Sequence, residues 1–128
     1  MKLIAHRGWS AGGDENTLAT FAPAARDDRI AGVEFDVCHA VDAMTLVVSH
    51  DPPLHIENAL TLDAALSFLS QTALELFVEI KETGLASVVI EKLVSNNVPT
   101  ARSCSHLPPS HDPFRGRGAR PVRLTACT

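Results

Sequence analysis

Short apolar runs alternate with stretches of helical periodicity along residues 1–98. Four runs are rich in β-forming residues or alternate apolar with polar positions, which predicts strands over 2–6, 32–37, 45–49 and 74–80. Three segments carry apolar residues at helical spacing, which predicts helices over 18–25, 62–69 and 84–97. Pro23 lies inside the first helical pattern, where it removes a backbone hydrogen bond and is expected to kink the helix.

Helices connect most of the predicted strands, and this order is typical of α/β proteins with a parallel sheet covered by helices. The four strands are therefore expected to be neighbours in one parallel sheet. A fifth strand is due after Asn97, and Val98 begins where it should start. The sequence turns proline-rich at that point, so we expect no further strand.

Residues 99–128 differ in composition from residues 1–98. The first segment holds 6 Lys and Arg against 14 Asp and Glu, whereas the second holds 5 Arg against 1 Asp and five of the eight prolines. Few apolar residues and many prolines cannot offset the entropy of ordering, which predicts an irregular or disordered tail. Two interpretations stay open: a natural flexible C-terminus, or a truncated or frame-shifted coding region that changes near Pro99.

Overall composition excludes several classes of protein. The chain has 128 residues, a size that suits one domain, with 45% hydrophobic and 20% charged residues. No apolar run approaches the roughly 18 residues that a membrane helix needs. A net charge of −4 argues against nucleic-acid binding. Three cysteines without metal-type spacing make a disulfide framework improbable, and a cytoplasmic location is expected.

Ionisable residues gather where the predicted strands end. In the alternating strand over 32–37, the apolar residues face the helices, so Glu34 and Asp36 point together to the other face. Glu79 and Lys81 do the same in the last strand. The C-terminal ends of parallel strands meet at one rim, where α/β folds carry their sites. Seven residues are expected at that rim: His6, Arg7, Glu34, Asp36, His50, Glu79 and Lys81.

These residue types suit a metal and a phosphate group. Three carboxylates brought together are costly unless neutralised, and a hard cation such as Mg²⁺ or Ca²⁺ is the natural partner. Arg7 and Lys81 add positive charges suited to binding phosphate. A histidine titrates near neutrality, so His6 and His50 suit acid and base roles across a phosphoryl centre.

Each signal also has a purely structural interpretation. A Glu-x-Asp pair is often a rim ion pair, and a histidine that ends a strand is often solvated. Asp51 either orients His50 or begins a turn. Asn16 or Thr17 can cap the first helix, and Glu15 and Asn16 are expected to organise the first strand–helix turn, with Asn16 favoured as the cap. Cys38 is expected in the core. The sequence identifies no partner for the remaining histidines, which are expected to be exposed to solvent: His39, His55, His106 and His111.

The motifs Ala5-His6-Arg7-Gly8, Glu15-Asn16-Thr17-Leu18, Glu34-Phe35-Asp36-Val37, His50-Asp51 and Glu79-Ile80-Lys81 resemble, in order, those of the glycerophosphodiester phosphodiesterases. The resemblance covers residues 3 to about 95, the first half of a typical family domain. It implies a TIM-type (β/α)8 barrel, here a partial one of about four strands. It also implies metal-dependent hydrolysis of a small-molecule glycerophosphodiester to an alcohol and glycerol 3-phosphate.

The resemblance assigns a role to each matching residue. His6 and His50 are implied as general acid and base, Arg7 and Lys81 as phosphate ligands, and three carboxylates as metal ligands: Glu34, Asp36 and Glu79. Three departures bear on these roles. Asp14 replaces the proline usual before Glu15, the segment between Asp51 and Thr61 is short, and the second half of the barrel is missing.

These departures leave two alternative hypotheses. One is a related phospholipase-type enzyme that acts on lipid headgroups with the same histidines and metal. The other is an inactive fragment, because a half-barrel exposes its sheet edges and inner face. The domain expected is 1–98, followed by the tail over 99–128, and the open edges predict self-association.

Overall fold

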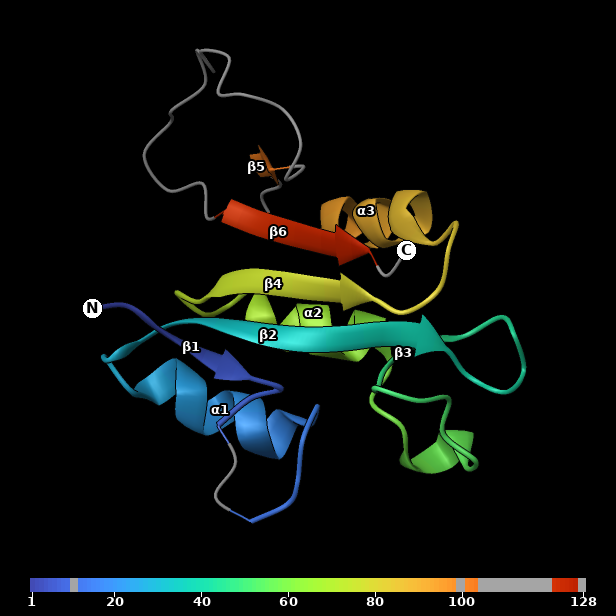
Figure 1. Ribbon diagram of the computed structural model, residues 1–128, viewed down its shortest axis with the longest axis horizontal. Coiled ribbons are helices and arrows are strands. Elements are labelled where there is room, and N and C mark those ends of the chain that lie inside the picture. Colours follow the sequence, from blue (N-terminus) through green and yellow to red (C-terminus); the bar gives the residue numbers. More distant parts are fainter. Residues whose placement is uncertain (10–11, 99–100, 104–120, 127–128) are drawn as a thin grey trace.

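The computed structural model describes residues 1–9, 12–98, 101–103 and 121–126. A sheet and a layer of helices dominate this part of the chain (Figure 1). The elements in chain order are β1 (Leu3–His6), α1 (Leu18–Arg26), β2 (Ile30–His39), β3 (Leu46–Val48), the 3-10 turn η1 (Ile56–Asn58), α2 (Leu62–Leu69), β4 (Glu75–Ile80), α3 (Ala86–Ser95), β5 (Ala101–Ser103) and β6 (Pro121–Ala126).

The parallel strands are ordered β1-β2-β4-β6-β5 across the sheet. β2 pairs with β1 and with β4, and its register sets Glu34 beside His6 on one side and Asp36 beside Glu79 on the other. The two central strands therefore bring the predicted rim residues into adjacent positions.

All three helices pack on the same face of the sheet. Alternate residues of β2, namely Val33, Phe35 and Val37, are fully buried in the core, together with Phe21 of α1 and Leu66 of α2. The Phe21 and Phe35 rings lie 5.8 Å apart between centroids. The intervening residues of β2 and β4 point to the opposite face, which no described helix covers. This alternation leaves the polar face of the sheet accessible.

Threonines begin the first two helices. Thr17 caps α1, accepting the Thr20 backbone N–H, while the Thr20 hydroxyl accepts the Thr17 N–H. Of the two predicted caps, Asn16 and Thr17, the structure has Thr17, so the preference for Asn16 is wrong. Thr61 caps α2 as predicted. Pro23 lies inside α1, and the helix continues past it to Arg26.

The strand predicted over 45–49 exists, but its expected parallel direction is wrong. β3 is antiparallel to β2, pairing Val48 with Val37 and Leu46 with His39. The connection between them is a tight turn at 40–45, where the Ala40 N–H donates to the Thr45 carbonyl at 2.8 Å. A short turn cannot cross over to a parallel position, so the chain must reverse.

The expectation that no strand follows Asn97 is also corrected. β6 lies parallel to β4, with Val122 beside Leu76 and Leu124 beside Val78, and β5 pairs with β6. Val122 is buried in the core, which gives β6 an apolar face toward the helices. The remaining residues of 99–128 lie outside the described part, so the proposed division at residue 98 stays a prediction. None of the described helices is long and apolar enough to cross a membrane.

Candidate functional site

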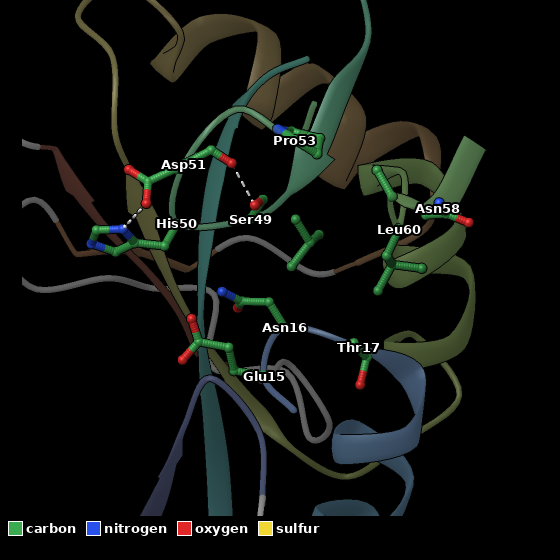
Figure 2. Close-up of a pocket in the computed structure, with 11 residues that line it drawn as sticks. Glu15, Asn16, Thr17, Ser49, His50, Asp51, Pro53, Asn58 and Leu60 are labelled. Carbon is green, nitrogen blue, oxygen red and sulfur yellow. Dashed lines mark hydrogen bonds and ion pairs between the residues drawn. The ribbon is translucent and has the colours of Figure 1, made fainter. Parts of the chain in front are cut away.

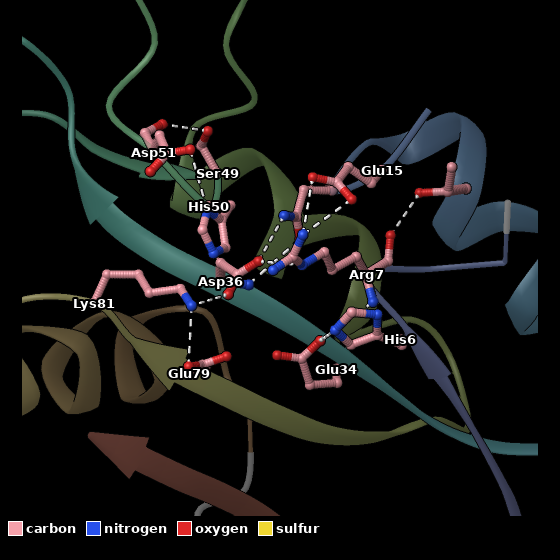
Figure 3. Close-up of polar contacts among 12 residues, drawn as sticks. His6, Arg7, Glu15, Glu34, Asp36, Ser49, His50, Asp51, Glu79 and Lys81 are labelled. Atoms are coloured by element: carbon pink, nitrogen blue, oxygen red, sulfur yellow. Dashed lines mark hydrogen bonds and ion pairs between the residues drawn. The ribbon is translucent and has the colours of Figure 1, made fainter. Parts of the chain in front are cut away.

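Three carboxylates converge at the C-terminal ends of β2 and β4. Glu34, Asp36 and Glu79 each offer one oxygen, and these oxygens lie within 4.8 Å of one another (Figure 3). Glu34 and Asp36 are two residues apart on β2, and Glu79 is the neighbour of Asp36 across the β2–β4 ladder. Strand periodicity and register together create this cluster.

Asp36 is the centre of the site. Its side chain is fully buried, with Oδ2 2.9 Å from Arg7 Nε and Oδ1 3.0 Å from Lys81 Nζ. Asn16 Nδ2 donates to Oδ2 at 2.9 Å. Burial raises the pKa of Asp36, but the Asn16 hydrogen bond and the positive charges of Lys81 and Arg7 outweigh it, so the net pKa is lowered. Asp36 is held as a carboxylate.

Arg7 ties the turn after β1 to the cluster. Its backbone N–H donates to Glu34 Oε2 at 3.2 Å, and its Nη1 lies 3.1 Å from both carboxylate oxygens of Glu15. The backbone is left-handed at Arg7, with φ of 53°, and the Thr20 hydroxyl donates to its carbonyl. Burial lowers the pKa of Arg7, but the hydrogen bond to Glu15 and the surrounding carboxylates raise it overall.

Negative charge exceeds positive charge in this cluster. Among the described residues, four carboxylates, counting Glu15, lie against two permanent cations, Arg7 and Lys81. Burial raises the pKa of Glu34, and the nearby Asp36 and Glu79 charges raise it further. The hydrogen bond from the Arg7 N–H and the proximity of His6 lower it, but the net pKa is raised. A bound cation would relieve this repulsion.

The carboxylates fit a hard divalent cation on a second ground. Asp36 Oδ1 is buried, and its contact with Lys81 lacks the alignment of a hydrogen bond. A buried carboxylate oxygen with incomplete hydrogen bonding is a suitable ligand atom for Mg²⁺ or Ca²⁺. The donor set is all oxygen, which is the preference of these ions rather than of zinc.

Both predicted histidines lie at this rim, and they reach it from different directions. His6 ends β1, and its Nε2 is 3.7 Å from Glu34 Oε2. β2 continues three residues past Asp36, and β3 then runs back antiparallel to the end of β2. His50, which follows β3, is thereby returned to the rim. The Ser49 N–H donates to the Asp36 carbonyl at 3.1 Å, which fixes this return. The predicted location holds, although the parallel arrangement from which it was inferred does not.

A cavity of about 260 Å³ opens beside His50 (Figure 2). Asp51 Oδ2 contacts His50 Nδ1 at 3.1 Å, which fits the first of the two roles considered for Asp51, although both side chains are exposed. The opposite wall is the turn that carries Glu15 and Asn16, and the short segment over 51–60 closes the remaining side. The cavity therefore adjoins the carboxylate cluster through residues of the first turn.

One partnership escaped the sequence analysis. His39 was expected to be exposed to solvent, with no partner identified, but its backbone N–H and its Nδ1 both contact the Glu82 carboxylate. No motif joins two residues 43 positions apart; the only available signal was that His39 ends one strand and Glu82 lies two residues after the end of its neighbour. His55 is exposed and lies 3.6 Å from Glu57. His106 and His111 lie outside the described residues.

Cys38 is buried, as expected for a core residue. It lies against β3, where its Sγ contacts the Ser49 carbonyl at 3.5 Å. Burial raises the pKa of its thiol to about 11, and the Glu82 and Asp36 charges add to this increase. A thiol with this pKa is not a nucleophile at neutral pH.

The fold is that of a partial TIM-type barrel whose described strands do not close. The chain is similar to the crystal structure of a glycerophosphodiester phosphodiesterase from Agrobacterium tumefaciens, with a TM-score of 0.60 and 24% sequence identity. The similarity covers 77% of this chain and 54% of that chain, so the protein spans about half the length of this structural relative. No protein-family model matches the sequence, and no curated protein matches it.

Proposed function

We propose that the chain belongs to the glycerophosphodiester phosphodiesterases and carries a site for metal-dependent hydrolysis of phosphodiesters. The observation that carries this proposal is a cluster in which Asp36 lies beside two further carboxylates and two cations. A histidine ends β1 on one side of the cluster, and another follows β3. Likeness to the Agrobacterium enzyme supports the choice of reaction. The motifs shared with this family supply the same residues in the same order.

In this proposal Glu34, Asp36 and Glu79 hold the divalent cation. When bound, a Mg²⁺ or Ca²⁺ ion supplies Lewis-acid stabilisation of charge on phosphoryl oxygens. Asn16 keeps the Asp36 carboxylate in place through its hydrogen bond to Oδ2. The backbone N–H of Arg7 does the same for Glu34.

Arg7 and Lys81 bind the phosphate of the substrate. Both cations are paired with carboxylates, Arg7 with Glu15 and Asp36, and Lys81 with Asp36 and Glu79. A phosphate oxygen competes with these carboxylates for the same N–H donors, and a planar guanidinium offers several donors at once. The pairs keep both cations oriented toward the rim until substrate arrives.

His6 and His50 transfer the protons. One imidazole accepts the proton of the attacking oxygen as its bond to phosphorus forms. The other imidazole donates a proton to the leaving oxygen as its bond to phosphorus breaks, which releases an alcohol and glycerol 3-phosphate. His50 is oriented by Asp51, whereas His6 lies beside Glu34.

The test is hydrolysis of glycerophosphocholine by the full chain with Mg²⁺ or Ca²⁺, with and without EDTA. His6→Ala, His50→Ala and Glu34→Ala are each expected to abolish turnover, while His55→Ala, which changes an exposed histidine away from the cluster, leaves it intact. β1 and β5 are the edge strands of the sheet among the described residues, and edge strands can pair with another copy, so each species separated by size is assayed alone. A folded, metal-loaded sample without turnover would refute the proposal. Turnover of sphingomyelin instead would favour the lipid-headgroup alternative.

A further inference from the structure

The Glu82 carboxylate holds His39 by two contacts outside the carboxylate cluster. Its Oε1 accepts the His39 backbone N–H at 2.8 Å, and its Oε2 lies 2.9 Å from His39 Nδ1. Both side chains are partly buried. Two charge-assisted contacts from one carboxylate restrain its position more strongly than a single surface ion pair.

These contacts occupy the place where the β2–β4 ladder stops. The last paired positions are Val37 and Ile80, and one further bond runs from the Lys81 N–H to the Val37 carbonyl at 3.0 Å. The chain then turns at Gly84 toward α3. Beyond Val37, β2 pairs with β3 on its other edge. The Glu82 side chain therefore supplies the next tie between the two strand ends, one residue after Lys81.

We propose that Glu82 and His39 form a bracket that positions Lys81 at the phosphate end of the site. The phosphate role of Lys81 rests on the proposed function; the bracket itself rests on the contacts above. Glu82 and His39 are positioning residues, because neither belongs to the carboxylate cluster and each acts through the backbone beside Lys81.

Lys81 needs such a restraint more than its neighbours do. Its Nζ must stay 3.0 Å from both Asp36 and Glu79, although its backbone lies at the start of a loop. A lysine side chain is long and flexible, so displacement of its backbone changes where the ammonium can reach. Displacement of a binding group by about 1 Å can cost roughly 100-fold in rate.

The bracket also joins two parts of the site. His39 is the last residue of β2 and pairs with Leu46, the first residue of β3. β3 leads directly to His50. Glu82 therefore connects the loop that carries Lys81 to the hairpin that carries His50, and both should loosen when this carboxylate is removed.

The first test is a double-mutant cycle on kcat/KM for glycerophosphocholine. Glu82→Ala is expected to lower kcat/KM about tenfold, in the range usual for residues that orient a site. Glu82→Gln restores part of this loss, because its amide oxygen can still accept the His39 N–H. The matched control is Glu91→Ala, an exposed carboxylate of α3. In a Lys81→Ala background, Glu82→Ala should cause a clearly smaller loss, because only the effect through the His50 hairpin remains; an equal loss in both backgrounds would overturn the proposal.

A second test needs no enzyme activity. The sequence has three lysines, Lys2, Lys81 and Lys92, so the ¹³Cε signals are few enough to resolve, and the one lost in Lys81→Ala identifies Lys81. Glu82→Ala should move the Lys81 signal toward that of the exposed Lys2 and narrow it, whereas Glu91→Ala leaves it unchanged. An unchanged Lys81 signal in folded Glu82→Ala contradicts the bracket.

The two tests separate the bracket from the proposed function. If the wild-type chain shows no turnover, the proposed function fails and the lysine spectrum alone decides the bracket. If Glu82→Ala does not fold, Glu82→Gln and His39→Asn are compared in the same spectrum. A Lys81 signal like that of the wild type in both would overturn the proposal.

Discussion

Asn16 holds both ends of Asp36: its Nδ2 donates to the carboxylate at 2.9 Å, and its Oδ1 accepts the Asp36 backbone N–H at 3.3 Å. Asn16 is buried and has a left-handed backbone, with φ of 55°. Asparagine tolerates this conformation better than most residues, and its amide offers the donor and the acceptor that Asp36 requires.

Replacing Asn16 should therefore destabilise the protein in a way that depends on charge. Asn16→Gly keeps the backbone conformation and removes both hydrogen bonds, at an expected cost of about 1–3 kcal/mol. Asn16→Asp retains the shape but places a second carboxylate against Asp36, and it should cost more at pH 7 than at pH 4. Urea unfolding at the two pH values measures this, and equal losses for both variants would contradict the assigned contact.

Divalent cations should stabilise the folded chain. A cation present at 100 times its dissociation constant adds about 2.7 kcal/mol to the free energy of unfolding. Melting curves with Mg²⁺ or Ca²⁺ should thus shift upward by several degrees. Glu79→Gln is expected to reduce the shift and Glu91→Gln to preserve it, since only Glu79 belongs to the cluster. No shift in the wild-type protein at millimolar cation would count against the metal site.

Gly8 is required by both its backbone and its surroundings. Its φ is 92°, and a Cβ placed there would lie 2.6 Å from Thr20 Cβ and collide with the Thr20 hydroxyl. Gly13 has a similar φ of 94°, and no atom of the described residues lies within 4 Å of a Cβ placed there, so Gly13→Ala isolates the backbone cost. We expect losses of about 1–2 kcal/mol for Gly13→Ala and about 2–4 kcal/mol for Gly8→Ala. Equal losses of unfolding free energy for the two variants in chemical denaturation would contradict this, because they would mean that Thr20 moves aside at no cost.

Acid should weaken the Glu82–His39 contact. The hydrogen bonds from the His39 side chain and backbone lower the pKa of Glu82 against the opposing effect of burial. A carboxyl whose folded pKa is depressed contributes stability above its unfolded pKa of about 4.3, and that contribution disappears as pH falls through the folded value. The wild type should exceed Glu82→Gln in unfolding free energy at pH 6, and the difference should shrink toward pH 3. A difference independent of pH would refute this origin.

Local pattern predicted the elements that carry the cluster. The alternation of Val33, Phe35 and Val37 with Glu34 and Asp36 assigned one face of β2 to the core and the other to the site, and the structure has this arrangement. The motif beginning at Glu79 then placed the third carboxylate, because the neighbouring parallel strand carries it in register. Thr61 as a cap and Cys38 as a core residue followed from equally local signals.

The remaining features depend on contacts that periodicity does not encode. The direction of β3 is set by the tight turn at 40–45, whose four residues between Ala40 and Thr45 give no clear hairpin signal. Asn16 and Thr17 are both residue types that cap helices well. The Asn16 side chain is instead hydrogen-bonded to the buried Asp36, which leaves Thr17 as the cap, and the local sequence does not show this contact. The strand character of β6 was hidden because its apolar residues alternate within an arginine-rich, proline-rich segment.

β3 runs antiparallel to the end of β2, where β2 extends beyond its pairing with β4. His50 is therefore positioned by this hairpin and not by a separate parallel strand of the barrel. Residues 41–44 form the exposed tip of this hairpin, beyond the last paired positions of β2 and β4. Residues can be inserted at this tip while the β2–β3 register is kept, and neither the sheet nor the carboxylates need move. The β2–β3 hairpin thus positions His50, whereas β1 of the parallel sheet positions His6. The length of the hairpin tip can therefore change, in evolution or by engineering, without altering the strand that carries His6.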